Sequence, residues 1–307
     1  MKNRIVVFGS SGRVGKEVVT QCFFGDTLLS PNEKEIDITK GQQTRDYIRD
    51  AQPDLVVNLA AYTDVDGCEK NRELAYAVNA AGAENIALAC VTSKSRLIHI
   101  STDYVFDGEK DQAYIEDDHM CPINYYGSTK AMGERFVTTV AERDKLDSLT
   151  IRTSWVYGRF APSFVEAILK KVMASNRQLQ VVKDQIGSPT LAYDLAKAIE
   201  YVANKKISGL VHFANSGSCS RYEFAYNAVA MANLVTLKNR FCFAGPLNPD
   251  RLEPALTDEL PSKDAKRPKY TVLGSKRTHD IGYPPRRPWQ EALMRHIIDL
   301  KEQGFFF

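Results

Sequence analysis

The sequence predicts an α/β fold, with a doubly wound parallel sheet and a smaller domain at its C-terminal end. Two observations predict this class. Short continuous apolar runs alternate with stretches of helical periodicity through the first half of the chain, and a glycine-rich loop directly follows the first apolar run. Continuous apolar runs are typical of strands that are covered on both faces, and their alternation with helices indicates βαβ units.

The first half of the chain has a regular rhythm. Its predicted strands and helices follow one another at residues 5–8, 14–22, 55–59, 74–90 and 97–100. After about residue 152 the rhythm becomes irregular, with predicted helices at 164–173, 194–203, 222–232 and 289–301 and a predicted strand at 210–213. The stretch 246–268 is rich in proline and charge, so we expect a long loop there. The acidic residues 116–118 are expected to lie in a solvated loop.

The composition excludes several classes of protein. The 307 residues are 44% hydrophobic and 25% charged, which is typical of one large globular domain or two closely joined ones. Forty Lys and Arg against 38 Asp and Glu give a net charge of +2, which argues against a nucleic-acid or membrane-surface partner. No run approaches the ~20 apolar residues that span a bilayer, and the N-terminus lacks the pattern of a signal peptide. The six scattered cysteines indicate reduced thiols in a cytoplasm.

The glycine-rich loop follows the first predicted strand and opens the first predicted helix. Its three glycines recur at every third residue. Glycines at such a place let a pyrophosphate approach the backbone, and the N–H groups at the start of the helix bind its charge. We therefore predict a dinucleotide site that includes Gly9, Ser11, Gly12, Arg13, Val14 and Gly15.

The sequence after the expected second strand lacks the acid that binds the ribose 2′-hydroxyl of NAD in many such sites. Residues 30–32 read Ser-Pro-Asn, Arg13 follows the second glycine of the loop, and Lys34 is a cation close by in sequence. This pattern favours NADP, with NAD as the alternative if Glu33 or Asp37 supplies the acid. Asp37 and Ile38 are expected beside the adenine, where a carboxylate can accept from the exocyclic amine.

Tyr126 and Lys130 lie four residues apart, which places both on one face of a helix. A phenol of pKa ~10 is a poor acid–base group at neutral pH, and a nearby cation lowers that pKa. The same ammonium can donate to ribose hydroxyls. The pair follows the glycine loop by about 110 residues and comes shortly after the Ser-Thr-Asp-Tyr-Val-Phe block at 101–106. This combination indicates a catalytic pair.

These blocks resemble the extended short-chain dehydrogenase/reductases and, within them, the dTDP-4-dehydrorhamnose reductases. The likeness covers essentially the whole chain, and its most discriminating block is Arg-Thr-Ser-Trp-Val-Tyr-Gly at 152–158. The other blocks are 9–15, 53–63, 64–66, 101–106, 126–130, 184–190 and 267–268.

The resemblance implies a Rossmann-type dinucleotide-binding domain over residues 1–160, with a returning segment at about 186–214. The remainder of 161–307 is then mainly a sugar-nucleotide-binding domain. The implied reaction is hydride transfer from NAD(P)H to the C4 ketone of a nucleotide-linked 4-keto-6-deoxy sugar, with dTDP-4-dehydro-L-rhamnose as the leading substrate. Tyr126 would protonate the forming alkoxide, Thr102 would hydrogen-bond the same oxygen, and Lys130 would tune the tyrosine.

The resemblance also implies the binding residues. Further contacts to the cofactor are expected from Ala60, Ala61, Tyr62, Tyr126 and Lys130. Contacts to the substrate are expected from Thr102, Asp103, Tyr104, Trp155 and Arg267. The indole of Trp155 would offer a flat apolar face to the deoxy sugar. Ser163 stands where the family commonly has Asn, which leaves one polar contact to the nucleotide sugar in doubt.

Alternatives stay open at this point. A reductase of a UDP-linked keto sugar, an enzyme that couples epimerisation to reduction, and a regulatory subunit that resembles the methionine adenosyltransferase β subunit share the pattern. The intact block at 152–158 favours a reductase. A homodimer stays open. No structural metal is predicted: some family members bind magnesium through carboxylates, and Glu17 could match one of them, but Tyr193 stands where another is expected.

Overall fold

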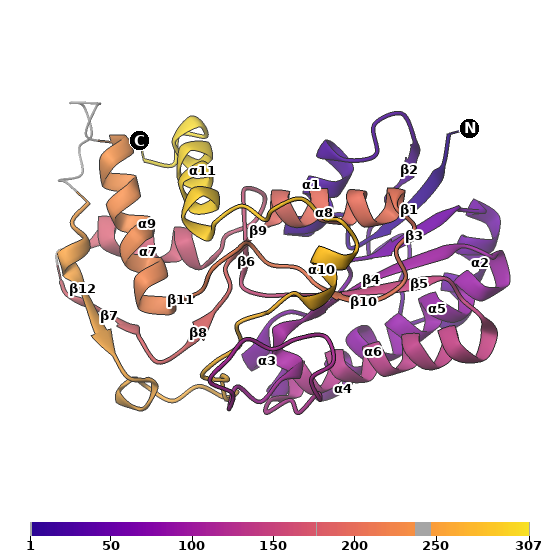
Figure 1. The fold of residues 1–307 in the computed structure, drawn as a ribbon, viewed down its shortest axis with the longest axis horizontal. Coiled ribbons are helices and arrows are strands. Elements are labelled where there is room, and N and C mark those ends of the chain that lie inside the picture. Colours follow the sequence, from indigo (N-terminus) through magenta and orange to yellow (C-terminus); the bar gives the residue numbers. More distant parts are fainter. Residues whose placement is uncertain (1, 176, 237–246, 307) are drawn as a thin grey trace.

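The computed structural model describes residues 2–175, 177–236 and 247–306. At its centre lies a six-stranded parallel sheet with the strand order β2-β1-β3-β4-β5-β10 (Figure 1). The strands are β1 (Arg4–Phe8), β2 (Thr27–Leu29), β3 (Leu55–Asn58), β4 (Arg96–Thr102), β5 (Ser148–Thr153) and β10 (Gly209–His212). The predicted class is confirmed. The winding direction changes between β1 and β3, and ligands of such sheets bind beyond the carboxyl ends of the strands at that place.

Helices cover both faces of the sheet. One face carries α1 (Arg13–Gln21) and α8 (Ala192–Asn204), and the other carries α2 (Gly41–Ala51), α5 (Gly82–Ser93) and α6 (Tyr125–Asp144). Successive residues of β1 therefore enter different cores: Ile5 and Val7 lie in the first, and Val6 and Phe8 lie in the second. This double coverage explains the continuous apolar runs.

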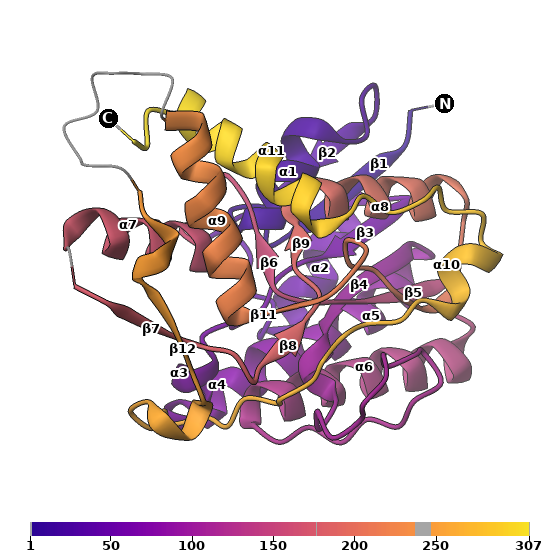
Figure 2. The same ribbon diagram turned by 60° about the vertical axis from the view of Figure 1, so that its left-hand side comes forward.

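The C-terminal part forms a separate core beside the carboxyl edge of the sheet (Figure 2). Its helices are α7 (Phe164–Ala174), α9 (Arg221–Thr236) and α11 (Trp289–Glu302). Three short strand pairs contribute to this core: β6 (Val156–Tyr157) with β9 (Thr190–Leu191), β7 (Leu179–Val182) with β12 (Leu252–Ala255), and β8 (Ile186–Gly187) with β11 (Cys219–Ser220). Single turns of 3-10 helix occupy Asp103–Val105, Pro249–Arg251 and Thr257–Glu259.

Two predicted elements differ in the structure. The expected loop at 246–268 contains β12, which pairs in parallel with β7 and buries Leu252 and Ala255; Pro246 lies outside the described residues. The expected helix at 74–90 is part of a longer stretch in which α4 (Arg72–Tyr76) passes through a π-helical turn, Ala77–Ala81, into α5. By length and composition this stretch, Arg72–Ser93, could cross a membrane, but half of its most apolar window is buried inside the fold.

Two segments of the second half return to the first part. α8 and β10 lie within the segment that was predicted to return, 186–214. The chain then comes back a second time, since Arg267 pairs with Asp66 and the ring of Tyr283 packs on Phe213. The predicted domain boundaries do not include this second return.

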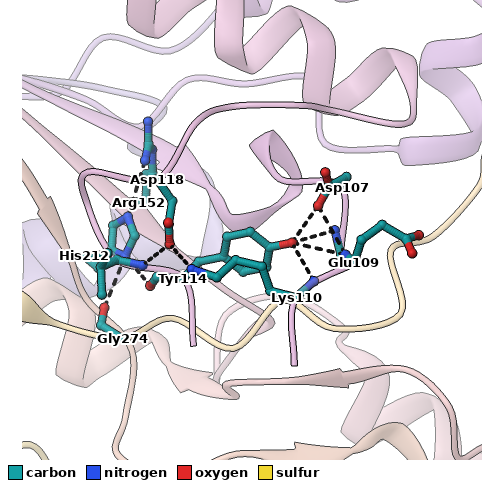
Figure 3. A network of polar contacts seen from close by, with 10 residues as sticks. Asp107, Glu109, Lys110, Tyr114, Asp118, Arg152, His212 and Gly274 are labelled. Carbon is teal, nitrogen blue, oxygen red and sulfur yellow. Dashed lines mark hydrogen bonds and ion pairs between the residues drawn. The ribbon is translucent and has the colours of Figure 1, made fainter. Parts of the chain in front are cut away.

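The loop before α6 is held by a polar network (Figure 3). The hydroxyl of Tyr114 donates to Asp107 at 2.6 Å and accepts from the main-chain N–H groups of residues 108–110. His212 of β10 lies at the other end of the network, with its Nδ1 3.1 Å from the carbonyl oxygens of both Tyr114 and Gly274. The network fastens this loop to the outer strand of the sheet.

The acidic residues at 116–118 are only partly solvated. Glu116 is buried and accepts from the main-chain N–H groups of His212 and Lys276, the latter at the start of α10 (Lys276–Asp280). Only Asp117 of the three is exposed, and it pairs with the Lys276 ammonium at 2.6 Å. The expectation of a solvated loop is thus wrong for Glu116, because its carboxylate satisfies main-chain donors that a sequence pattern does not reveal.

Candidate functional site

The glycine loop lies at the carboxyl end of β1, beside β3, where the winding direction changes. Gly9 has φ of 75°, and a Cβ on it would lie 2.6 Å from the main-chain nitrogen of Ala60. A Cβ on Gly15 would lie 2.1 Å from the carbonyl oxygen of Gly9. Gly12 caps α1 without a side-chain hydrogen bond, so the first N–H groups of the helix keep no side-chain partner. The loop therefore fits a phosphate group.

The side chain of Arg13 does not point toward the ribose end of this site. Its guanidinium donates to the main-chain carbonyls of Val156 at 2.9 Å, Ala161 at 3.4 Å and Pro162 at 2.5 Å. Burial lowers the pKa of this guanidinium. Arg13 thus ties the glycine loop to β6 and the segment after it, and its contact with a cofactor stays a prediction. Ser11 is exposed, and Val14 packs on the core under α1.

The end of β2 carries no acid, as the sequence indicates. The carbonyl of Ser30 accepts from the Ser10 hydroxyl at 3.3 Å. Glu33, the first carboxylate after β2, is exposed, and the next one, Glu35, accepts from the Asn32 main-chain N–H at 2.9 Å. Asp37 accepts from the Thr39 hydroxyl at 2.7 Å, and this hydrogen bond lowers the pKa of the Asp37 carboxyl.

Ile38 and the residues after β3 line the path from the glycine loop to α6. Ile38 is buried against Gly82. A Cβ on Gly82 would lie 2.8 Å from the Cδ1 atom of Ile38. Ala60 donates its main-chain N–H to the side chain of Asn58 at 3.1 Å. Ala61 is partly buried between Ala60 and Tyr62. These positions agree with a cofactor that runs along the carboxyl edge of the sheet.

Asn79 holds this path in place and carries no signal that sequence reasoning used. It lies in the π-helical turn, is buried, and accepts from the main-chain N–H of Tyr62 at 2.8 Å. Its amide donates to the Thr129 hydroxyl at 3.1 Å. Asn79 therefore connects the loop after β3 to the residue that precedes Lys130. Single π-helical turns inside α-helices occur frequently at functional sites, and this one places the amide.

Thr102, Tyr126 and Lys130 lie together at the carboxyl end of β4. The Lys130 ammonium donates to the carbonyl of Ile100 at 2.7 Å, and its burial lowers its pKa to about 8. A hydrogen bond joins the Tyr126 hydroxyl to Thr102. Burial raises the pKa of Tyr126, and the bond to Thr102 opposes that rise. The expected lowering of the Tyr126 pKa by Lys130 is therefore not what this site shows: the phenol keeps its proton.

Asp103 faces into the protein. Its carboxylate accepts from the hydroxyls of Thr102 at 3.1 Å and Ser154 at 2.8 Å, and from Thr271. Burial raises the pKa of this carboxyl, and the hydrogen bonds oppose the rise. These hydrogen bonds orient Thr102 and join the ends of β4 and β5, and the contact of Asp103 with the sugar stays a prediction.

Tyr104 extends the site from the catalytic residues toward the C-terminal part. Its ring meets that of Tyr126 edge to face, with centroids 5.9 Å apart. Its hydroxyl is hydrogen-bonded by two arginines, Arg221 and Arg267. Arg267 also pairs with Asp66 of α3 (Val65–Lys70) at 2.6 and 2.8 Å, which lowers the pKa of Asp66 to about 2.

Trp155 contacts Arg221, which in turn is hydrogen-bonded to Tyr104. The Arg221 guanidinium carbon lies 3.5 Å from the indole centroid, so it covers one face of the ring. The indole also lies against Gly187, where a Cβ would come within 2.4 Å of it, and the Trp155 backbone has φ of 46°. The face over which the guanidinium lies is not open to a sugar while Arg221 keeps this place. Sequence reasoning missed Arg221 altogether.

The carboxylate considered for a metal has another partner. Glu17 is buried and pairs with Arg159 at 2.6 Å. Tyr193 supplies no carboxylate beside it. In the part of the chain that the structure describes, no group of three or more His, Cys, Asp or Glu side chains could hold a metal ion. Ser163 caps α7 in a reciprocal arrangement with Glu166.

The chain matches the family model described as "RmlD substrate binding domain" over residues 2–302. It is 38% identical over 296 residues to a dTDP-4-dehydrorhamnose reductase of Mycolicibacterium smegmatis, with 95% of this chain and 84% of that protein covered. It is 37% identical to the spore coat polysaccharide biosynthesis protein SpsK of Bacillus subtilis, with 96% of each covered.

Solved structures show the same likeness. A dTDP-4-dehydrorhamnose reductase of Bacillus anthracis in complex with NADP superposes with a TM-score of 0.88 at 33% identity, covering 97% of this chain and 100% of that one. A UDP-glucose 4-epimerase of Thermus thermophilus with NAD shares the fold, with a TM-score of 0.81 at 17% identity over 97% of this chain and 99% of that one.

Proposed function

The chain belongs to the RmlD substrate binding domain family, and from this premise we propose that it reduces the C4 ketone of dTDP-4-dehydro-L-rhamnose to give dTDP-L-rhamnose. The observation that carries this function is the grouping of Thr102, Tyr126 and Lys130 beyond the carboxyl end of β4, beside a glycine loop that fits a phosphate. The chain is an NADP-dependent oxidoreductase of the extended short-chain type.

The residues present fit a dinucleotide. The loop at Gly9 and Gly15 has no room for a Cβ, and α1 begins without a side-chain cap, so main-chain N–H groups would hold the pyrophosphate. NADPH, when bound, supplies the hydride for the ketone carbon. Lys130 would hold the ribose, because an ammonium has three donors and the Ile100 carbonyl takes one of them.

The chain's own acid would be Tyr126. Reduction of a ketone leaves an alkoxide that must gain one proton, and a phenol whose pKa is raised by burial holds its proton until that charge develops. Thr102 would bind the same oxygen, since its hydroxyl is already hydrogen-bonded to Tyr126. Without substrate the Thr102 hydroxyl donates a hydrogen bond to the Asp103 carboxylate at 3.1 Å, so Thr102 would turn this one donor from Asp103 to the ketone oxygen when the substrate binds. Preorganised groups of this kind lower the barrier without reorganising during the reaction.

The same surface offers the substrate contacts. Tyr104 and Arg267 are proposed to face the nucleotide sugar, with Trp155 behind them. A cytoplasmic location is part of this proposal, because the described cysteines are unpaired thiols.

The experiment that tests this function is a substrate panel. Purified protein is mixed with NADPH and with dTDP- and UDP-linked 4-keto-6-deoxyhexoses, and the loss of absorbance of the reduced cofactor is followed. We expect turnover with dTDP-4-dehydro-L-rhamnose. Turnover with the UDP-linked sugars alone would assign a different substrate. No turnover with any ketone would contradict a reductase and favour a regulatory protein.

A further inference from the structure

Arg221 lies outside the catalytic group, but hydrogen bonds at the start of α9 fix its backbone. It is the first residue of α9, and its main-chain N–H donates to the carbonyl of Gln185 at 3.0 Å. Ser220 and Glu223 close the start of the helix reciprocally, since Ser220 donates its main-chain N–H to Glu223 at 2.7 Å and its hydroxyl accepts from the Glu223 N–H at 3.0 Å. The backbone of Arg221 is therefore fixed.

Two aromatic rings hold the guanidinium. Its carbon lies 3.5 Å from the centroid of the Trp155 indole and 5.2 Å from that of the Phe164 ring. Contacts of this kind attract a cation to the ring faces and leave its N–H groups free at the edge of the guanidinium plane. Trp155 and Phe164 thus fix the orientation of the guanidinium and the direction of its N–H donors.

The donors have too few partners within the described residues. The Tyr104 hydroxyl is hydrogen-bonded to Arg221, but one hydroxyl cannot satisfy the several N–H groups of a guanidinium. Asp103 is the nearby carboxylate that attracts Arg221, but its oxygens already accept from the hydroxyls of Thr102, Ser154 and Thr271. The guanidinium is therefore a fixed cation with N–H donors that lack acceptors. Two such donors can bind two oxygens of one anion side by side, which is a geometry that a phosphate offers.

The layout of the site indicates which anion Arg221 would bind. Tyr126 is the acid for C4 of the sugar, and the nucleotide diphosphate of such a substrate is attached at C1, across the pyranose ring. Tyr104 lies next to Tyr126, and its hydroxyl is the point on which Arg221 and Arg267 converge. Arg267 has its own carboxylate partner in Asp66, whereas Arg221 has no such ion pair among the described contacts.

We propose that Arg221 is a substrate-recognition residue whose guanidinium, held between Trp155 and Phe164, binds the diphosphate of the nucleotide sugar. This inference rests on the proposed function and deepens it. Trp155 is then a platform for a cation, which replaces the expected stacking of its indole on the deoxy sugar. Arg267 approaches the same diphosphate from the other side of the Tyr104 hydroxyl.

The test measures nucleotide binding without any ketone. Isothermal titration with dTDP and with thymidine, in the presence of NADP, is carried out on the wild type and on Arg221→Met and Arg221→Lys. Arg221→Met should weaken dTDP binding by about 10- to 100-fold, the usual loss for a charge-assisted hydrogen bond, and leave thymidine binding unchanged. Arg221→Lys keeps the charge without the fork and should give an intermediate loss. Arg135→Met, an exposed arginine of α6, is the matched control and should bind dTDP as the wild type does.

Several outcomes would overturn the inference. The first is a dTDP affinity within about twofold of the wild type in folded Arg221→Met. The second is an equal loss of affinity for dTDP and thymidine, and the third is a wild type that does not bind dTDP. If Arg221→Met does not fold, Arg221→Lys decides in the same way. A protein that binds dTDP through Arg221 but reduces no ketone would contradict the proposed reaction alone. Reduction of the ketone with dTDP binding indifferent to Arg221 would contradict this inference alone.

Discussion

The Lys130 ammonium donates a hydrogen bond to the main-chain carbonyl of Ile100 at 2.7 Å. Ile100 lies in β4, two residues before Thr102, so one contact fastens α6, which carries Tyr126 and Lys130, to the strand that carries Thr102. The ammonium is buried there, and burial lowers its pKa to about 8 while Glu134 raises it in part. The charge of Lys130 is therefore within reach of a modest change of pH.

A first prediction follows for the pH dependence of catalysis. Since the pKa of Lys130 is about 8, the group loses its proton as the pH rises through that value, and the ribose loses a cationic donor. We expect kcat/KM, which reports the free enzyme, to fall above about pH 8. Steady-state rates between pH 6 and 10 check this. In Lys130→Met the plateau should be lower and the break near pH 8 absent; a wild-type profile that stays flat to pH 10 would contradict the assignment.

A second prediction concerns the choice of cofactor. Ser30 is exposed and directly follows β2, where a carboxylate would repel a 2′-phosphate. The wild type should therefore use NADPH at least as well as NADH. Ser30→Asp should lower the ratio of kcat/KM for NADPH to that for NADH by about tenfold or more, because like charges would face each other. Initial rates with both cofactors measure this. An unchanged ratio would place the 2′-phosphate elsewhere.

A third prediction concerns stability at low pH. His212 is buried beside Arg152 and Glu116, and burial lowers its pKa from 6.5 to about 4. The unfolded chain then binds the extra proton first, so this group's contribution to stability is lost as the pH falls from about 6.5 to about 4, by an amount of the order of 3 kcal/mol.

Urea unfolding at a series of pH values measures that loss. His212→Asn should lower stability at neutral pH, because it disturbs the contacts to Tyr114 and Gly274, and should lose less stability than the wild type on acidification. His119→Asn, in the same loop but exposed, is the matched control and should behave as the wild type. Parallel curves for the wild type and His212→Asn would show that His212 does not titrate in this range.

The apolar runs predicted β1, β3, β4 and β10 because this signal is local, whereas β5, between β4 and β10, was not predicted. Residues 5–8 are apolar on both faces of β1, and the structure buries alternate side chains in different cores. The strand β12 was missed because it is short and contains Pro254, and its pairing with β7, about 70 residues earlier, has no local pattern. Proline is tolerated in such a strand at an edge.

The site was predicted in part for the same reason. Tyr126 and Lys130 are one helical turn apart, so their spacing alone places them together. The partners of Arg13, which are carbonyls of residues 156, 161 and 162, lie far along the chain and have no side-chain signature. The contact of Arg221 with Trp155 likewise depends on how β11 pairs with β8. Ser220 and Glu223 could have marked the start of α9, but not what its first side chain touches.

The central claim is that Tyr126 is the acid of the reaction, and Tyr126→Phe with NADPH and dTDP-4-dehydro-L-rhamnose tests it most directly. The substitution removes only the hydroxyl, so the affinity for NADPH should stay within about twofold while kcat falls by ~10²-fold or more. Tyr125→Phe, whose ring packs under Arg72 on the outside of α6, is the matched control and should keep the wild-type rate. A Tyr126→Phe protein that binds NADPH and reduces the ketone at the wild-type rate would contradict the account.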